Sequence, residues 1–458
     1  MPTKSPLAWP KPFSRESSLN KLPSPTSAST GLLDKKTAAI VFLAFAAAYC
    51  LSALVRAIIA TLSPVLSQEF SLQSRDLGLL AGGYFLGFAA TQLPLGTWLD
   101  KHGPKRVIVC FLVVAVLGCL VFSIATSFSG LLVGRVLIGM GVSACLMAPL
   151  SGFRRWLDTP SLMRANSWML MSGSLGMLAS TLPVQWLLPL VGWRALFWGL
   201  AGLVFLAMLV IAFVVPKWNI APTLVASRTA PPPEGANFSR GGSSKNSLTS
   251  DSNEGYAEIW KSRYFQKLSP LAFFNYGGLV AVQTLWAGPW MIKVSSYTPL
   301  EAATGLFYIN AVMLLTFWSW GLVNPYLAKA GWHTDRLLAW GVPFSLVALA
   351  ANIVGGASTG WVGWALFCVA STVISLSQPA VGMAFKPALA GRALSAFNLV
   401  IFAGVFTVQW GIGLLIDAFA ALGLAQVASF QAAFGVFLCC CIAAYVYFLR
   451  VKVDNPNQ

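Results

Sequence analysis

The amino-acid sequence predicts an all-α integral membrane protein whose twelve transmembrane helices form two six-helix bundles. Three observations lead to this fold class: an apolar composition, twelve apolar runs of membrane-spanning length, and a polar segment that separates the first six runs from the last six. Hydrophobic residues make up 57% of the 458 residues and charged residues 10%, and the mean hydropathy is +0.72. Water-soluble domains carry about 25% charged residues, so this composition excludes a soluble enzyme or binding module.

Each predicted span holds the roughly 20 apolar residues that a helix needs to cross the hydrocarbon core of a bilayer. Charged residues, prolines and glycine clusters bound the runs and mark the helix ends. The twelve predicted spans are 38–66, 76–99, 107–127, 130–152, 166–190, 195–216, 268–292, 303–327, 337–356, 361–384, 393–418 and 428–449. Their even number places both chain ends on one side of the membrane.

A polar linker and an internal repeat predict the division into two bundles. Residues 217–267 include APPPEGANFSRGGSSKNSLTSDSNEG, a composition that buries too little apolar surface to fold alone. Val184-Gln185-Trp186 in the fifth span recurs as Val408-Gln409-Trp410 in the eleventh, 224 residues later. The predicted order is a disordered tail (1–37), a six-helix bundle (38–216), a cytoplasmic linker (217–267), a second six-helix bundle (268–450) and a short tail (451–458).

The placement of lysine and arginine predicts the orientation. Of the 30 basic residues, 25 fall in the tails and in the loops on the same side as the tails. The opposite loops hold only Arg75, Arg194 and Lys293, and Arg56 and Arg135 lie inside spans. The positive-inside rule therefore predicts a multi-pass protein of the cell (inner) membrane with both termini cytoplasmic. The net charge of +16 then faces anionic lipids and requires no nucleic acid, and we expect a functional monomer.

The chain shows no sign of a cofactor or a metal site. All eight cysteines fall within predicted spans without metal-ligand spacing to either histidine, so we interpret them as small apolar packing residues. The first 35 residues are rich in Ser, Pro and Lys and lack the apolar region of a secretory signal. We interpret them as a disordered cytoplasmic tail, with an organelle transit peptide as the alternative.

The loop between the second and third spans, GTWLDKHGPKR, carries the most specific motif of the chain. Its pattern is G-x-x-x-D-[KR]-x-G-x-[KR]-[KR], and the matching residues are Gly96, Asp100, Lys101, Gly103, Lys105 and Arg106. This pattern resembles the signature loop of the major facilitator superfamily of secondary transporters. The resemblance implies alternating access, with helices 1, 4, 7 and 10 around a central cavity. It also implies a gating loop, in which Asp100 accepts bonds from a helix N-terminus or an arginine when the cytoplasmic side is closed.

Two further motifs agree with this resemblance. Arg135, Gly139 and Gly141 match the family's R-x-x-x-G-x-G pattern in the fourth span, and Gly192-Trp193-Arg194 matches its G-W-R turn. The family's Gly-Pro antiporter motif is not reproduced in the fifth span. The resemblance covers about residues 38 to 450.

Two arginines are the clearest candidates for substrate contact. Arg56 lies about ten residues below the outer end of the first span, and Arg135 about five below that of the fourth. A charge inside the membrane costs several kcal/mol without a partner. No acid falls in the middle of a span, since Glu69, Asp76 and Asp417 lie near outer ends. Arginine stays protonated when buried, so carbonyls, water or a bound anion must serve as its partner.

Each arginine keeps an alternative interpretation. For Arg135 we favour hydrogen bonds to carbonyls of helix 1, with direct substrate contact as the second interpretation. For Arg56 we favour contact with the substrate or a coupling ion, over a structural hydrogen bond or an extension of the side chain to the outer surface.

The other candidates are amides in spans expected near the cavity: Asn275, Gln283, Gln185, Asn398 and Gln409. Amides bind substrate oxygens, but they also bond across helix interfaces, and this packing role is the alternative for each. Gln283 stands out because it precedes Trp286-Ala-Gly288-Pro289-Trp290, and Trp286 is a candidate for the cavity wall. A Gly-Pro step can break a helix at a transport site, with a simple kink as the alternative.

These features predict a transporter without catalytic residues. The chain has no phosphate-binding glycine loop, no paired carboxylates inside the membrane and no zinc spacing, so it is not expected to be an enzyme or an ATP-driven pump. We predict a secondary active transporter of a small solute, favouring a small organic anion coupled to an ion gradient, for instance in symport with a proton. The alternatives are a transporter or exporter of a neutral or amphipathic solute and, third, a membrane sensor that does not transport.

Overall fold

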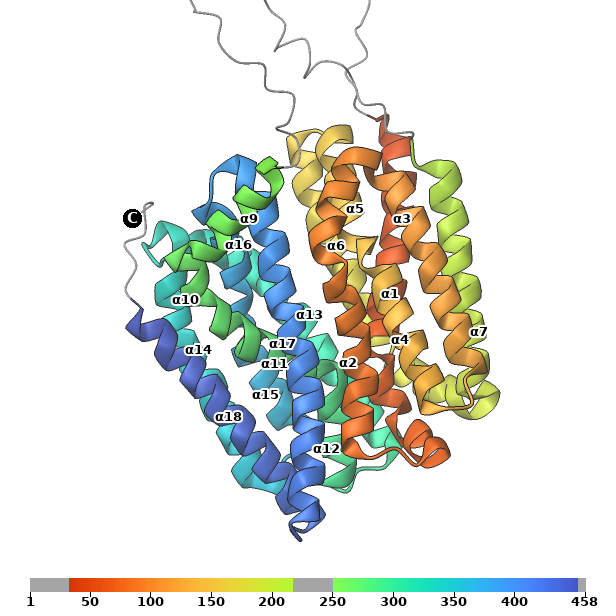
Figure 1. Ribbon diagram of the computed structural model, residues 1–458, viewed down its shortest axis with the longest axis vertical. Helices are drawn as coiled ribbons and strands as arrows, with labels where there is room; N and C mark the ends of the chain where they lie inside the picture. The colour runs from red at the N-terminus through yellow and green to blue at the C-terminus, as the bar shows by residue number, and fades with distance from the viewer. Residues whose placement is uncertain (1–32, 217–249, 452–458) are drawn as a thin grey trace, which may run out of the picture.

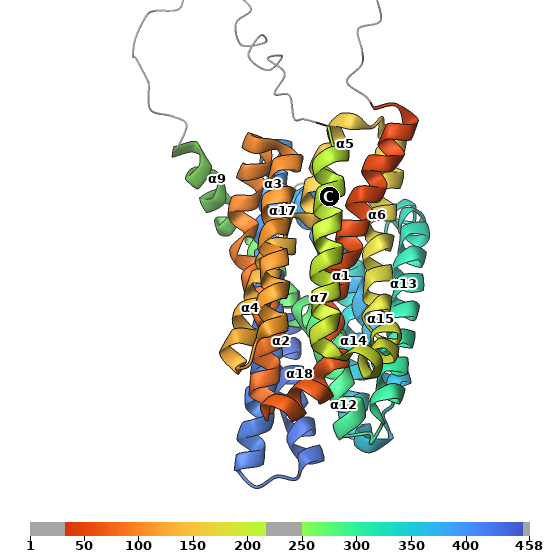
Figure 2. The ribbon, with the colours of Figure 1, turned by 90° about the vertical axis from the view of Figure 1, so that its right-hand side faces the viewer.

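The computed structural model describes residues 33–216 and 250–451, which contain helices and turns but no strand. Most of the predicted tails and linker therefore lie outside the described residues. Figures 1 and 2 show a long bundle with helix axes roughly parallel to one direction. We call the end at which the first helix begins the tail face and the opposite end the far face. Under the predicted topology the tail face is cytoplasmic.

The first half contains six membrane crossings. They are built from α1 (Lys35–Phe70), α2 (Ser74–Ala90), α3 (Gln92–Ile124), α4 (Phe128–Val142), α5 (Ala144–Trp156), α6 (Thr159–Ala179) and α7 (Leu182–Val214). The helices α3 and α7 each reverse direction at a glycine with non-helical angles, Gly103 and Gly192, so each belongs to two crossings. The second crossing combines α2 with the start of α3, and the fifth combines α6 with the start of α7.

The second half repeats this plan. It contains α9 (Ser250–Lys261), α10 (Arg263–Leu271), the π-helix η1 (Ala272–Tyr276), α11 (Gly277–Ala281), the π-helix η2 (Val282–Trp286), α12 (Ala287–Lys293), α13 (Pro299–Lys329), α14 (Thr334–Gly355), η3 (Gly356–Ser358), α15 (Trp361–Ser371), η4 (Thr372–Leu376), α16 (Ser377–Ala384), α17 (Pro387–Ala421) and α18 (Gln426–Arg450). The seventh crossing runs from α10 to α12, and the tenth from α15 to α16.

The predicted fold class is confirmed. Nine helices of the described chain are long and apolar enough to cross a membrane on their own. The second, fifth and seventh crossings complete the predicted twelve, and each is interrupted. The second is divided after Ala90 and the fifth after Ala179, and two π turns divide the seventh.

The turns between helices repeat from one half to the other. Positive φ angles are unfavourable for residues with a Cβ atom, and among the described residues six of the seven occur in three matched pairs, Gly356 being the exception. These are Ser71 and Ser296, 225 residues apart; Gly103 and Gly331, 228 apart; and Gly192 and Gly423, 231 apart. The spacing agrees with the 224-residue offset of the sequence repeat, as expected of parallel repeats in a transporter.

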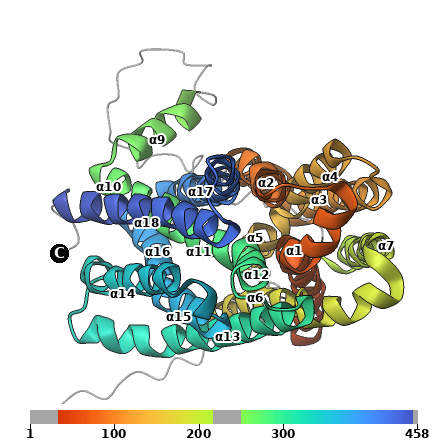
Figure 3. The ribbon, with the colours of Figure 1, turned by 90° about the horizontal axis from the view of Figure 1, so that it is seen from below.

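Several helix pairs join the halves. Seen from the far face, α1 lies beside α12, α2 beside α17, and α6 and α7 beside α13 (Figure 3). The pair α2 and α17 touches backbone to backbone, because a Cβ added at Gly78 would lie 2.4 Å from the Gln409 carbonyl oxygen, and one at Gly413 would lie 2.4 Å from that of Ser74. Small residues allow such close helix packing in membranes.

One helix falls inside the range predicted to be linker. The segment α9 (Ser250–Lys261) packs against α17, and its Ile259 is fully buried. The composition of the whole range is polar, but its last part, YAEIWKSRYF, supplies apolar side chains that bury against the second half. The packed chain of the second half therefore starts before residue 268.

Candidate functional site

Arg56 lies near the middle of α1 and is surrounded by aromatic side chains. Tyr49 and Tyr84 interact electrostatically with its guanidinium, and Tyr276 of the π-helix η1 does so more weakly. The Phe88 ring lies 5.9 Å from its Cζ atom. Tyr276 comes from the other half of the chain, so this cluster bridges the two bundles. We call these five residues the Arg56 cluster.

Several polar atoms of this region are buried without a hydrogen-bond partner among the described residues. They are Arg56 Nε, the Tyr84 hydroxyl and Ser52 Oγ, one helical turn from Arg56. No carboxylate of the described chain lies within ion-pair distance of Arg56 or Arg135. Unpaired buried polar groups are costly, so the site is suited to a polar, negatively charged guest.

The polar residues of α1 form a stripe on one face of the helix. Residues three, four, seven or eleven apart share a face, and this spacing aligns Tyr49, Ser52, Arg56, Ser63 and Ser67. The stripe runs from the Arg56 cluster toward the far face. The apolar Ala60 interrupts the stripe. At this residue α12 approaches α1, because a Cβ added at Gly288 would lie 3.1 Å from the Ala60 carbonyl oxygen.

Arg135 points at the backbone of α1. Its Nη1 donates to the Val55 carbonyl at 2.7 Å and its Nη2 to the Arg56 carbonyl at 3.4 Å, while its Cζ lies 5.1 Å from the centre of the Tyr84 ring. The side chain is fully buried. These contacts connect α4 to α1, as the structural interpretation of Arg135 expects, and Arg135 also bonds the carbonyl of Arg56 itself.

Three of the predicted amides have protein partners in the second half. Asn275 donates to the Cys441 carbonyl of α18 at 3.4 Å, Gln283 donates to Asn310 of α13 at 2.9 Å, and Asn398 accepts from Gln378 at 2.6 Å. These contacts join helices within the second half, as the packing interpretation of the three amides expects.

Of the remaining candidates, Gln409 and Trp286 join the seventh and eleventh crossings, whereas Gln185 stands alone. Gln409 donates to Thr284 at 3.0 Å, and Trp286 Nε1 donates to the Gln409 carbonyl at 3.0 Å, which joins η2 to α17. Gln185 is half-buried and its side chain makes no hydrogen bond within the described chain. The structure therefore does not bring the amides together around Arg56.

The Gly-Pro step of the seventh crossing does not break the helix. The chain continues as α12 through Pro289, but the preceding turn, η2, is wound as a π-helix. Because proline has no backbone N–H, the carbonyl four residues before it receives no helical hydrogen bond, and this accounts for the wider turn. The second π turn, η1, is far from any such step and carries Tyr276 into the Arg56 cluster.

A polar contact closes the far face between the halves. The Asp417 carboxylate of α17 accepts hydrogen bonds from the backbone N–H of Ser74 at 3.1 Å and of Arg75 at 2.8 Å, at the start of α2. A carboxylate at a helix N-terminus also interacts favourably with the helix dipole. We call this contact the Asp417 latch.

We expect the Asp417→Ala variant to shift the protein toward a far-face-open state. Loss of a carboxylate that caps a helix N-terminus costs about 1–2 kcal/mol, or roughly 5- to 30-fold in the equilibrium. The readout is labelling of an introduced Ala60→Cys by a membrane-impermeant maleimide, which should speed up by this factor. The control is Asp76→Ala, which removes a carboxylate that bonds Gln73 within the same half, at 3.1 Å. Equal rates in all three backgrounds would show that the latch does not hold the face closed.

The G-W-R turn forms a second far-face contact, this time inside the first half. Trp193 Nε1 and the Arg194 guanidinium both donate to the Glu69 carboxylate, at 2.7 Å and 2.5 Å, and Arg194 also bonds the Ala125 carbonyl. Gly192, with φ of 74°, permits the sharp turn that places both side chains there. This motif therefore ties the ends of three crossings together.

The signature loop lies at the tail face. Gly103 has φ of 77°, which explains why the motif has glycine at this position. A Cβ added at Gly96 would lie 3.9 Å from Ser395 Oγ of α17 in the other half. Lys101 and Arg106 are exposed and Lys105 is partly buried. The backbone of Asp100 belongs to α3, and its side chain lies outside what the structure describes.

Sequence reasoning missed the three tyrosines, the Asp417 latch and Asn310. Only Tyr49 carried a usable signal, since it stands seven residues before Arg56 on the same helical face. Tyr84 and Tyr276 come from other helices, and no spacing in the chain links them to Arg56.

Comparison with known proteins gives a consistent result. The family model described as Major Facilitator Superfamily matches residues 45–408. The chain is 28% identical over 164 residues to the chloroplastic ascorbate transporter of Arabidopsis thaliana, covering 33% of this chain and 29% of that protein. It is 24% identical over 161 residues to the hexuronate transporter of Escherichia coli K12 (33% and 37%). It is 27% identical over 184 residues to the multidrug resistance protein MdtL of Klebsiella pneumoniae (38% and 44%). The matches thus span less than half of these relatives.

Solved structures share the fold over nearly the whole chain. A bacterial homologue of the lysosomal transporter Spinster, in an inward-facing and unoccupied conformation, superposes with a TM-score of 0.70 at 17% identity, covering 91% of this chain and 97% of that one. A D-xylose-proton symporter superposes with a TM-score of 0.71 at 12% identity, covering 92% and 99%.

Proposed function

Since the chain belongs to the major facilitator superfamily, we propose that it is a secondary transporter of a small organic anion, which it moves by alternating access and by means of an ion gradient. The observation that carries the proposal is the Arg56 cluster: a guanidinium inside the membrane that has no carboxylate partner in the described chain and has tyrosines beside it. An anionic group of the substrate supplies the missing countercharge.

The aromatic rings around Arg56 suit the carbon skeleton of an organic anion. Tyr49, Tyr84 and Phe88 are almost fully buried, whereas Arg56 and Tyr276 are partly exposed. A guest therefore meets the guanidinium and one tyrosine first, with apolar walls behind them. Two of the relatives are named for ascorbate and hexuronate, which are organic anions, and this supports the same substrate class.

Alternating access requires contacts between the halves that form and break on each face. The Asp417 latch and the α2–α17 contact serve the far face in this proposal, and the signature loop with Asp100 serves the tail face. We also propose that the tail face is cytoplasmic, because the basic residues gather there. Symport is the proposed coupling: a proton that is carried together with the anion neutralises its charge, and the proton gradient then drives uptake.

The experiment is uptake by the full chain in proteoliposomes. A panel of carboxylates, inorganic anions and neutral solutes is offered under imposed pH and sodium gradients, with protein-free liposomes as the control. We expect saturable uptake of at least one carboxylate that depends on one of the two gradients. Uptake confined to neutral or amphipathic solutes would instead establish the alternative substrate class.

A further inference from the structure

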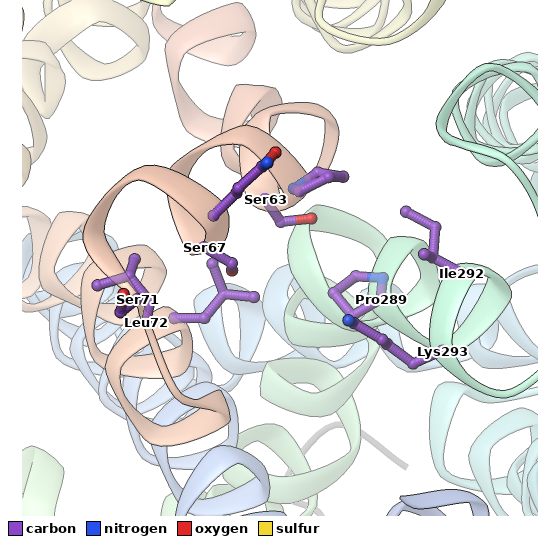
Figure 4. Close-up of a pocket in the computed structure, with 10 residues that line it drawn as sticks. Ser63, Ser67, Ser71, Leu72, Pro289, Ile292 and Lys293 are labelled. Carbon is purple, nitrogen blue, oxygen red and sulfur yellow. The ribbon is translucent and has the colours of Figure 1, made fainter.

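A cavity of about 450 Å³ opens at the far face between the two halves (Figure 4). One wall is the end of α1, with Ser63, Ser67 and Ser71, and the other is α12, with Pro289, Ile292 and Lys293. In Figure 4 the Lys293 side chain extends from α12 into the space between the two helices. We call this space the far-face cavity.

Lys293 differs from the other basic residues predicted for far-face loops. Arg194 forms an ion pair with Glu69 at 2.5 Å, and Arg75 lies 3.8 Å from an Asp76 oxygen. Lys293 has no ion pair with any described residue. Lys293 is exposed and lies in the last turn of α12, where a cation also interacts favourably with the helix dipole, so its distinguishing feature is its place in the wall of the cavity.

The cavity also offers hydroxyl groups. Ser67 and Ser71 make no side-chain hydrogen bond with a described residue, whereas Ser63 donates to the Ala60 carbonyl at 2.9 Å. Ser71 ends α1 in the left-handed conformation. One ammonium and two free hydroxyls are donors for a carboxylate or phosphate, and Pro289 and Ile292 provide an apolar wall.

The position of the cavity links it to the Arg56 cluster. Ser63 and Ser67 continue the polar stripe of α1, and Ser63 lies seven residues, or roughly 10 Å, beyond Arg56. Between them stands the close contact of α12 with the Ala60 carbonyl, at Gly288. A solute in the cavity is therefore one constriction away from Arg56.

We propose that the far-face cavity is a second anion site, in which Lys293, Ser67 and Ser71 hold the anionic group of a free organic anion before the far face opens. That this anion is the transported substrate rests on the proposed function, whereas binding in the cavity does not. The contact at Ala60 and Gly288 separates the two sites, and opening of the far face lets the anion move along the stripe to Arg56.

The test uses pyridoxal 5′-phosphate as an anionic probe that reacts with lysine. The full chain in detergent is treated with this reagent or with phosphate-free pyridoxal, reduced with borohydride, and analysed by mass spectrometry at Lys293. If the phosphate group binds in the cavity, labelling by pyridoxal 5′-phosphate should be saturable. It should also be at least about tenfold faster than labelling by pyridoxal, which is the effect of one charge-assisted hydrogen bond. The Ser67→Ala/Ser71→Ala variant should lose most of this preference, while Ser358→Ala, outside the cavity, should keep it.

Linear, unsaturable labelling with the same preference in all variants would overturn the proposal and leave an ordinary exposed lysine. A second arm separates free anions from lipid headgroups, by comparing nanodiscs of phosphatidylcholine with nanodiscs containing phosphatidylglycerol. Loss of labelling only with phosphatidylglycerol would assign the site to a lipid and overturn the proposed occupant. Arg56→Gln should leave labelling unchanged. If Lys293 is labelled as expected but Arg56→Gln transports anions normally, only the proposed function is refuted, and the anion site in the cavity stands.

Discussion

The Arg56→Gln variant is expected to bind the transported anion roughly 10- to 100-fold more weakly than the wild type. A charge-assisted hydrogen bond contributes about 1.5–3 kcal/mol, and each 1.4 kcal/mol corresponds to about a tenfold change in affinity. Arg56→Lys should recover only part of the loss, because an ammonium lacks the planar fork of guanidinium. The measurement is the substrate concentration that gives half-maximal uptake in proteoliposomes.

Arg75→Gln is the matched control for charge. It removes one positive charge from the same half, from a side chain that only approaches Asp76 at the far face. We expect its affinity to remain within about twofold of the wild type, since an exposed pair contributes at most about 1 kcal/mol to stability. If Arg56→Gln and Arg75→Gln show the same affinity as the wild type, the guanidinium of Arg56 does not hold the substrate.

The Gly413→Leu variant is expected to fold but to lose nearly all transport. A Cβ at Gly413 would lie 2.4 Å from the Ser74 oxygen and 2.9 Å from the Arg75 Cα, so backbone atoms block it and no side-chain movement relieves the clash. The two halves must then stay apart at the far face. A penalty of about 3 kcal/mol lowers the ratio of closed to open molecules roughly 100-fold, and turnover should fall as the closed state is depopulated.

The same helix offers a closely matched control. Gly411 has nothing within 4 Å of an added Cβ, so Gly411→Leu introduces the same side chain without a clash. Turnover is measured by uptake, and the far-face state by maleimide labelling of Ala60→Cys, which should become fast only in Gly413→Leu. Gel filtration and circular dichroism check that both variants are folded. Full transport by Gly413→Leu would show that α2 and α17 need not approach at the far face during the cycle.

Much of the fold could be predicted because the bilayer imposes a simple requirement on composition and length. The helices nevertheless extend beyond the predicted spans, as in α1 (Lys35–Phe70) against 38–66 and α17 (Pro387–Ala421) against 393–418. Hydropathy detects only the part inside the hydrocarbon, while a helix continues into water without penalty. The division of the fifth crossing after Ala179 was not predicted, although Ser180 and Thr181 stand at the break and Pro183 lies in the first turn of α7.

The candidate site was less predictable, because residue type does not determine the direction of a side chain. Arg56 and Arg135 were both singled out as charges inside spans. Only the structure shows that one lies among tyrosines while the other bonds the backbone of α1 at Val55. The amides were selected as possible ligands, yet several of them bond to other helices, as Gln283 does to Asn310. Periodicity carries no information on such contacts.

The most direct test of the account is a comparison of charge selectivity between the wild type and Arg56→Gln. Uptake is measured for the carboxylate identified in the solute panel and for its neutral amide analogue, in the same proteoliposomes. The account predicts that the wild type prefers the carboxylate by roughly 10- to 100-fold and that Arg56→Gln loses this preference. Equal preference for the carboxylate in both proteins would contradict it, because the charge selectivity would then arise away from Arg56.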